Sequence, residues 1–257
     1  SWLGIFSVRV LGVFQVFRGG QSILDRWSKT QTLKKSTKLE LEAQQLQDQV
    51  LAQERGIRLV LETEMDDARQ MQISLLSESD PIVAGLNIAG RSIAAKEVGG
   101  DFFDYLEKED KLLIAVGDVS GKGLKGAMNA VMAGSILNLS AKHQKTASAI
   151  MSEVNSSLCQ SMEQDMNVTM ILAQFDIDNK QMTLVNAGQH AYPLLKRGTS
   201  VEPMQAKGLA LGMIASIPYK PLRLELRSGD LLLLMTDGIT EPRNAEGLMY
   251  EESGRLH

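Results

Sequence analysis

The sequence contains little cysteine and has no strong excess of either charge. A lone cysteine, Cys159, cannot form an internal disulfide framework or a cysteine-based zinc cage, and this suits a reducing compartment such as the cytoplasm. The net charge of −4 provides no general attraction for nucleic acid, so we expect no nucleic-acid partner. The hydrophobic content of 44% excludes a disordered or fibrous chain and is enough for one domain with an appendage.

A complete membrane-spanning run is also lacking. Residues 2–17 are apolar, but Arg9 interrupts them, and a bilayer needs about 20 apolar residues. They could be the last strands of a sensor domain that lies upstream, or the end of a transmembrane helix, so an upstream membrane tether stays open. We expect residues 1–29 to be the remnant of such a domain. The chain starts at Ser1 and stops at His257, and we expect it to be a fragment.

Residues 30–76 are rich in Gln, Glu, Leu, Lys and Arg and contain no proline. Apolar residues recur there at spacings of three, four and seven, which predicts a long amphipathic helix: Leu39, Leu46, Val50, Ile57, Val60, Met65, Ala68, Met71 and Leu75. A stripe this narrow forms no core alone, so we expect coiled-coil-like pairing in a homodimer that transmits a signal. A passive spacer is the alternative, and Gly56 weakens the helix locally.

Three aspartates follow or adjoin apolar runs and have glycine beside them: Asp101 after Gly100, Asp118 before Gly121, and Asp237 before Gly238. Glycine lets the backbone turn tightly where a carboxylate must be presented. Several such carboxylates brought together bind Mg²⁺ or Mn²⁺ through oxygen. Taken singly, each aspartate could instead cap a helix or form a turn, as Asp104 could.

Residues 77–257 are expected to form a second, catalytic domain, because Pro81 and the polar residues before it end the helix. Strand-like and helix-like runs alternate in this domain, and residues 176–180 have the composition of a hairpin turn. We therefore predict a layered α+β domain. The strands are expected at Leu86–Ile93, Leu112–Val116, Val168–Phe175, Met182–Val185 and Leu231–Met235, and the helices at Leu124–Ala141 and Thr146–Met162.

Five motifs together resemble the SpoIIE/RsbU-type branch of the PP2C (PPM) serine/threonine phosphatases, over residues 64–257. Their order and spacing make the resemblance specific, whereas one Asp-Gly pair would not. The motifs are Glu97-Val98-Gly99-Gly100-Asp101, Gly117-Asp118-Val119-Ser120-Gly121, Asn186-Ala187-Gly188, Gly208-Leu209-Ala210-Leu211-Gly212 and Thr236-Asp237-Gly238.

The resemblance implies an αββα sandwich with two divalent cations, Mn²⁺ or Mg²⁺, at one edge. It implies that Asp101, Asp118 and Asp237 are metal ligands, that Asp118 bridges the two ions, and that Val119 contributes its carbonyl oxygen. Gly100, Gly121 and Gly238 would shape the site. Water activated by the metals would then hydrolyse phosphoserine or phosphothreonine on a regulatory protein, which by the resemblance is an anti-sigma-factor antagonist of the STAS type.

Two departures from the family pattern stand out. Relatives carry a further aspartate beyond the Thr-Asp-Gly motif, and this chain stops before it, so the last strand is expected to be missing and the fragment could be inactive. Relatives often have His-Asn after Asn-Ala-Gly, where this chain has Gln189-His190. The competing function is a non-catalytic partner-binding module with a vestigial metal site, and a phosphatase of small phosphoesters is a lesser variant.

Overall fold

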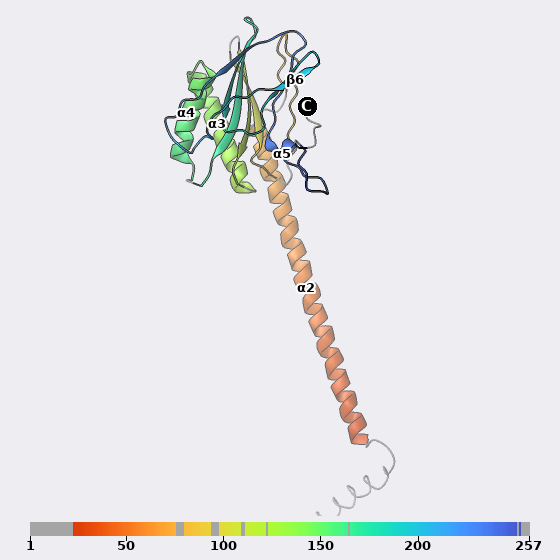
Figure 1. Cartoon of the computed structure of the whole chain (residues 1–257). Helices are drawn as coiled ribbons and strands as arrows, with labels where there is room; N and C mark the ends of the chain where they lie inside the picture. The colour runs from red at the N-terminus through yellow and green to blue at the C-terminus, as the bar shows by residue number, and fades with distance from the viewer. Residues whose placement is uncertain are drawn as a thin grey trace, which may run out of the picture. The chain divides into compact units, whose positions relative to one another are not determined.

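The computed structural model describes residues 23–75, 80–93, 98–108, 111–121, 123–163, 165–250 and 252. The chain divides into two compact units, residues 1–61 and 62–257 (Figure 1). The expected remnant at residues 1–22, together with Glu97 and Lys122, lies outside the described residues. No helix in the described ranges is long and apolar enough to cross a bilayer.

Helix α2 spans Ile23–Leu75, so it begins earlier than the predicted residue 30. In the first unit its apolar side chains are exposed in the single chain, including Leu46 and Val60. Within the second unit the last turns of α2 contact the domain, because buried Gln72 donates from Nε2 to the Gly99 carbonyl at 2.8 Å. The predicted long helix is thus confirmed, and its pairing with a second copy stays a prediction.

The second unit contains two antiparallel sheets. The larger has the strand order β1-β2-β3-β4-β7 and the smaller β6-β5-β8. The strands of the larger sheet are β1 (Phe102–Lys108), β2 (Lys111–Val119), β3 (Val168–Asp176), β4 (Gln181–Ala187) and β7 (Leu222–Glu225). Those of the smaller sheet are β5 (Leu194–Arg197), β6 (Ser200–Pro203) and β8 (Leu231–Leu233).

Helices α3 (Leu124–His143) and α4 (Ala147–Ser161) cover one face of the larger sheet (Figure 1). Small residues on α3, among them Ala130 and Ala133, are fully buried and allow the close approach. Helix α4 begins after Thr146, whose side-chain oxygen accepts from the Ala149 backbone N–H at 3.3 Å. These two helices match the predicted ranges.

The central strands β2 and β3 are buried on both faces of the larger sheet. On β3, Met170 and Leu172 face the helices, and Ile171 and Ala173 face the smaller sheet. The alternation follows from the two-residue period of a strand, so a continuous apolar run supplies two cores. This arrangement confirms the predicted α+β class with two sheets packed on each other.

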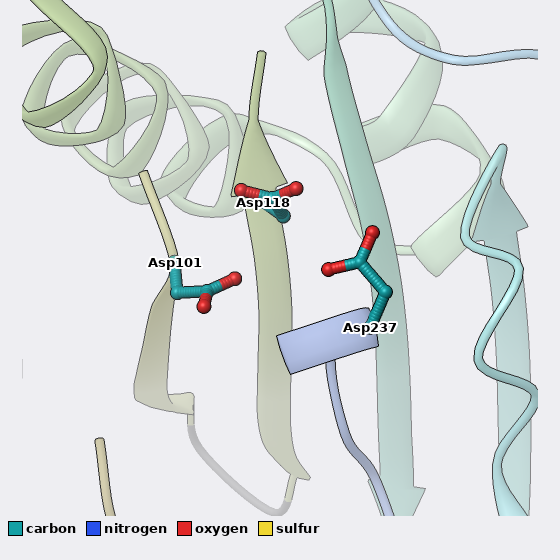
Figure 2. Close-up of side chains that lie close together, drawn as sticks. All are labelled: Asp101, Asp118 and Asp237. Atoms are coloured by element: carbon teal, nitrogen blue, oxygen red, sulfur yellow. The ribbon is translucent and has the colours of Figure 1, made fainter. Parts of the chain in front are cut away.

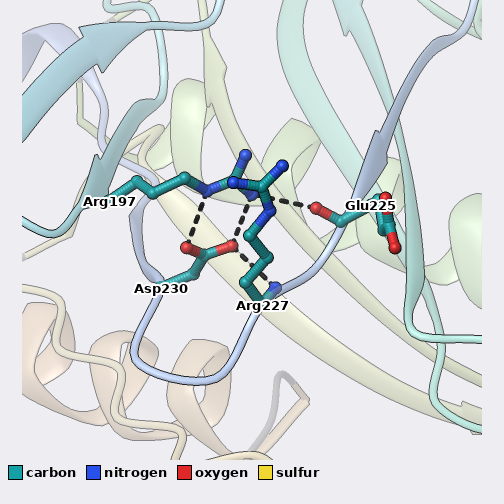
Figure 3. Close-up of polar contacts among 4 residues, drawn as sticks. All are labelled: Arg197, Glu225, Arg227 and Asp230. Carbon is teal, nitrogen blue, oxygen red and sulfur yellow. Dashed lines mark hydrogen bonds and ion pairs between the residues drawn. The ribbon is translucent and has the colours of Figure 1, made fainter.

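An ion pair fastens the smaller sheet to the turn between β7 and β8 (Figure 3). Arg197 on β5 donates from Nε and Nη2 to the two carboxylate oxygens of Asp230, at 2.9 and 2.6 Å. Asp230 also accepts from the Arg227 backbone N–H at 2.9 Å, and Arg197 donates to the Glu225 carbonyl. The guanidinium lowers the pKa of Asp230 to about 2. The turn leads into β8 and then toward Asp237.

One predicted strand is wrong. Residues 86–93 form no strand, although Leu86 and Ile88 pack against the core between the sheets. Asp80 instead holds this segment, because its Oδ1 accepts from the Gly90 backbone N–H and from the Tyr105 hydroxyl. Strand β8 ends at Leu233, two residues before the predicted end, and β1, β5, β6 and β7 were not predicted.

Candidate metal centre

The three predicted aspartates come together in space. Asp101 directly precedes β1, Asp118 is the penultimate residue of β2, and Asp237 opens the short helix α5 (Asp237–Thr240). One carboxylate oxygen from each lies within 4.8 Å of the others. Figure 2 shows the carboxylates directed toward a common space. Residues separated by more than a hundred positions in the sequence thus form one acidic cluster.

Strand pairing explains why Asp101 and Asp118 meet. Phe102 pairs with Gly117 across β1 and β2, so the same register continued by one residue places Asp101 opposite Asp118. The backbone continues this approach, since the Val119 N–H donates to the Gly100 carbonyl at 3.3 Å. Residues opposite each other on antiparallel strands have Cβ atoms about 5 Å apart. The sheet therefore sets the spacing of two carboxylates before any ligand is present.

Glycines leave the space around the cluster open. A Cβ atom at Gly100 would collide with the Val119 carbonyl oxygen and lie 3.1 Å from Asp118 Oδ1. A Cβ atom at Gly238 would lie 3.2 Å from Asp101 Oδ2. Gly121 has a φ of 113°, a conformation that side chains of L-residues rarely adopt. All three predicted site-shaping glycines thus border the aspartates or the loop that follows Asp118.

The electrostatics of the cluster reflect clustered negative charge. Burial raises the pKa of Asp118 to about 7, and the charges of Asp101 and Asp237 add to the shift. Burial likewise raises the pKa of Asp101, against a hydrogen bond from Thr236 that lowers it. A hydrogen bond between the two carboxyl groups raises the pKa of Asp118 and lowers that of Asp101, as expected when Asp118 is the donor. Such a cluster favours a nearby positive charge.

The donor set fits a hard divalent cation. Asp101 Oδ1 is buried and has no hydrogen-bond partner, although buried polar atoms normally have one. Among the described residues, no lysine or arginine forms an ion pair with the three aspartates. The available donors are carboxylate oxygens and the neighbouring Val119 carbonyl, which are the ligands that Mg²⁺ and Mn²⁺ prefer.

Two further polar residues singled out in the sequence lie outside the cluster. Asp104 is buried on β1, where Oδ2 accepts from Asn138 Nδ2 on α3 at 2.6 Å and Oδ1 accepts from the Tyr105 N–H. It therefore joins the sheet to a helix. His190 is exposed, whereas its neighbour Gln189 is buried.

Two polar contacts around the cluster were not predicted. Thr236 hydrogen-bonds to Asp101, and its place directly before Asp237-Gly238 was the available signal. Gln189 accepts from the Thr169 hydroxyl at 2.7 Å and donates to the Met235 carbonyl at 3.4 Å. Thr169 pairs with Asp118 across β2 and β3, and this pairing is visible only in the folded chain.

Comparisons with known proteins place this site in a known context. Residues 108–257 match the model of the family described as stage II sporulation protein E (SpoIIE). The chain is 28% identical over 196 residues to phosphoserine phosphatase RsbU of Bacillus subtilis (strain 168). That alignment covers 76% of this chain and 58% of RsbU, so the chain spans less than two thirds of this relative.

Two solved structures are similar to the chain. The PP2C domain of SiaA from Pseudomonas aeruginosa has a TM-score of 0.62 at 20% identity, covering 75% of this chain and 78% of that one. The RsbU and RsbW domains of a Mycobacterium tuberculosis protein have a TM-score of 0.52 at 25% identity, covering 60% of this chain and 44% of that one. The first of these shows the fold alone.

Proposed function

The chain belongs to the SpoIIE family, and from that premise we propose that it is a metal-dependent protein phosphatase that hydrolyses phosphoserine or phosphothreonine on a regulatory protein. The observation that carries the proposal is the acidic cluster of Asp101, Asp118 and Asp237, with oxygens within 4.8 Å of one another. The relative RsbU is described as a phosphoserine phosphatase, which supports the same reaction for this chain.

The metal ligands of this proposal are Asp101, Asp118, Asp237 and the Val119 carbonyl. Two divalent cations, Mn²⁺ or Mg²⁺, supply when bound the neutralisation of phosphoryl charge and the activation of water that hydrolysis requires. The chain's own contribution is preorganisation: the β1–β2 register holds Asp101 against Asp118, and α5 presents Asp237 from the other sheet. Gly100 keeps the Val119 carbonyl uncovered, and the raised pKa of Asp118 reflects a site built for positive charge.

The proposed substrate is a phosphorylated protein of the STAS type, and the proposed setting is the cytoplasm. The relatives support a regulatory context, since one of the similar structures contains RsbU and RsbW domains together. We propose residues 77–257 as the catalytic domain, residues 30–76 as a dimerising helix that regulates it, and residues 1–29 as the remnant of an upstream sensor. Gln72 supports regulation through α2, because its side chain holds the carbonyl of Gly99, two residues before Asp101.

A non-catalytic partner-binding module is the competing proposal. Against it stands the raised pKa of Asp118, because three clustered carboxylates destabilise a fold that makes no use of them. The same physical cost makes the two proposals separable by experiment.

Phosphate release from a serine-phosphorylated STAS-domain protein tests the proposal. We expect release with Mn²⁺, none with a chelator, and none from the Asp118→Asn variant. Asp176→Asn is the matched control, because Asp176 ends β3 at the opposite edge of the same sheet and its Oδ1 acceptor survives the change. Since a last strand is expected beyond residue 257, the same assay is run on a version extended through it. Silence from both versions would favour the partner-binding module.

A further inference from the structure

The loop after β6 exposes two adjacent apolar side chains. Met213 and Ile214, called here the apolar tip, are each 55% exposed. Single exposed apolar residues are ordinary on protein surfaces, whereas clustered ones often mark contact sites. The tip therefore calls for a physical reason, and the way the loop is held supplies part of it.

A fully buried asparagine fixes the backbone on both sides of Met213. Asn155 on α4 accepts at Oδ1 from the Gly212 N–H at 3.0 Å and donates from Nδ2 to the Ile214 carbonyl at 2.9 Å. A buried amide side chain needs such partners, and both of these contacts go to this loop. Ser216, just beyond, has a φ of 60° in the left-handed region. The apolar tip is thus preorganised, and a preorganised loop loses less entropy on binding.

The loop joins the sheet edge that carries Asp118. Leu211 exchanges two backbone hydrogen bonds with Val168, at 2.8 and 3.1 Å. Val168 also pairs with Val119, the residue after Asp118, on its other side. Neighbouring strands lie about 4.8 Å apart, so Leu211 is about 10 Å from Val119.

Met166 lies between the acidic cluster's loop and the apolar tip's loop. A Cβ atom at Gly121 would lie 3.1 Å from Met166 Cε, and one at Gly212 would lie 3.7 Å from the Met166 carbonyl oxygen. Gly121 is three residues after Asp118, and Gly212 directly precedes Met213. The apolar tip and the cluster are therefore neighbours on one edge of the domain.

We propose that the apolar tip is a docking surface for the folded protein substrate, contacting an apolar patch beside its phosphorylated residue. The inference rests on the proposed function and deepens it. A small phosphoester bound at the cluster cannot reach across two strand spacings, whereas the surface of a protein can. A second copy of this chain seated on the tip would stand beside the cluster and obstruct that substrate, so the substrate is the occupant we assign.

The test compares a protein substrate with a small one on the full chain. The variant is Met213→Ser with Ile214→Ser, and the matched control is Leu139→Ser, because Leu139 is 57% exposed on α3 toward the end away from the cluster. The probes are a serine-phosphorylated STAS-domain protein and p-nitrophenyl phosphate. We expect the ratio of the two kcat/KM values, protein over small ester, to fall about tenfold in the double variant, as truncation of interface anchors does. The control should keep the wild-type ratio.

Each other outcome has a defined meaning. An unchanged ratio in the folded double variant, on an active wild-type chain, overturns the docking surface and leaves the phosphatase proposal standing. A wild-type chain that releases phosphate from neither probe refutes the proposed function and the docking surface with it. Light scattering that shows self-association lost in the double variant assigns the tip to a second copy and also overturns the inference. If the double variant does not fold, the two single variants make the same comparison.

Discussion

Replacing Asp118 by asparagine should change the stability of the domain in opposite directions with and without metal. Asparagine has the same shape, can accept from the Val119 N–H at Oδ1 and can donate to Asp101 from Nδ2, so the local contacts survive. The charge does not survive, and burial with two neighbouring carboxylates makes that charge unfavourable. The variant should therefore be more stable than wild type when no cation is bound.

The size of the effect follows from the pKa. A shift of the Asp118 carboxyl from 3.8 to about 7 corresponds to an upper bound of about 4 kcal/mol at pH 8, since one pKa unit is about 1.4 kcal/mol. The side chain is only half-buried, and solvent screening reduces this to about 1–2 kcal/mol. For a domain of this size, that is a rise of about 2–8 °C in Tm in chelator.

The pH dependence has a definite sign. Because the folded-state pKa of Asp118 is raised, its favourable contribution is complete below the unfolded pKa near 4 and is lost as the pH rises through about 7. The difference between variant and wild type should thus appear between pH 4 and 8 and vanish below pH 4. With Mn²⁺ at about 100 times its Kd, wild type should gain about 2.7 kcal/mol and the variant almost nothing.

Thermal unfolding followed by circular dichroism measures both effects, with Asp176→Asn as the control. The reasoning predicts that the order of stability reverses between chelator and Mn²⁺. A variant that is less stable than wild type in chelator and is still stabilised by Mn²⁺ to the same extent would refute it.

Two further predictions concern the framework around the cluster. Asp230→Ala should destabilise the domain by about 1–3 kcal/mol through loss of a charge-assisted hydrogen bond, and because the pKa of Asp230 is lowered to about 2, its contribution should disappear as the pH falls from 4 to 2; acid unfolding of both proteins measures this, and parallel curves would contradict it. Gln72→Ala removes the bond to the Gly99 carbonyl and should weaken Mn²⁺ binding several-fold in calorimetry, whereas an unchanged Kd would separate α2 from the site.

The elements that were predicted from the sequence are the long ones. Helices α3 and α4 and strands β2, β3 and β4 have uninterrupted apolar patterns, and buried two-sided strands read as continuous apolar runs. Strands β5, β6 and β7 have four residues each, too few for a period to emerge. Strand β1 mixes aromatic and charged residues and is recognisable as a strand only through its pairing with β2.

The segment 86–93 shows why an apolar pattern is not sufficient. Leu86 and Ile88 do point into the core, but their backbone pairs with no strand, and Asp80 holds the segment by side-chain hydrogen bonds instead. The aspartates of the cluster could be named because glycines mark the turns beside them. The contacts of Thr236, Gln189 and Asn155 depend on residues brought together by folding, and no local pattern predicts them.

The central claim is that Asp101, Asp118 and Asp237 hold divalent cations, and a crystal of the chain soaked in Mn²⁺ tests it most directly. Anomalous difference maps collected at the manganese edge should show density between the three carboxylates, at about 2.1 Å from their oxygens. No density there at saturating Mn²⁺, in a crystal whose fold matches Figure 1, would contradict the claim.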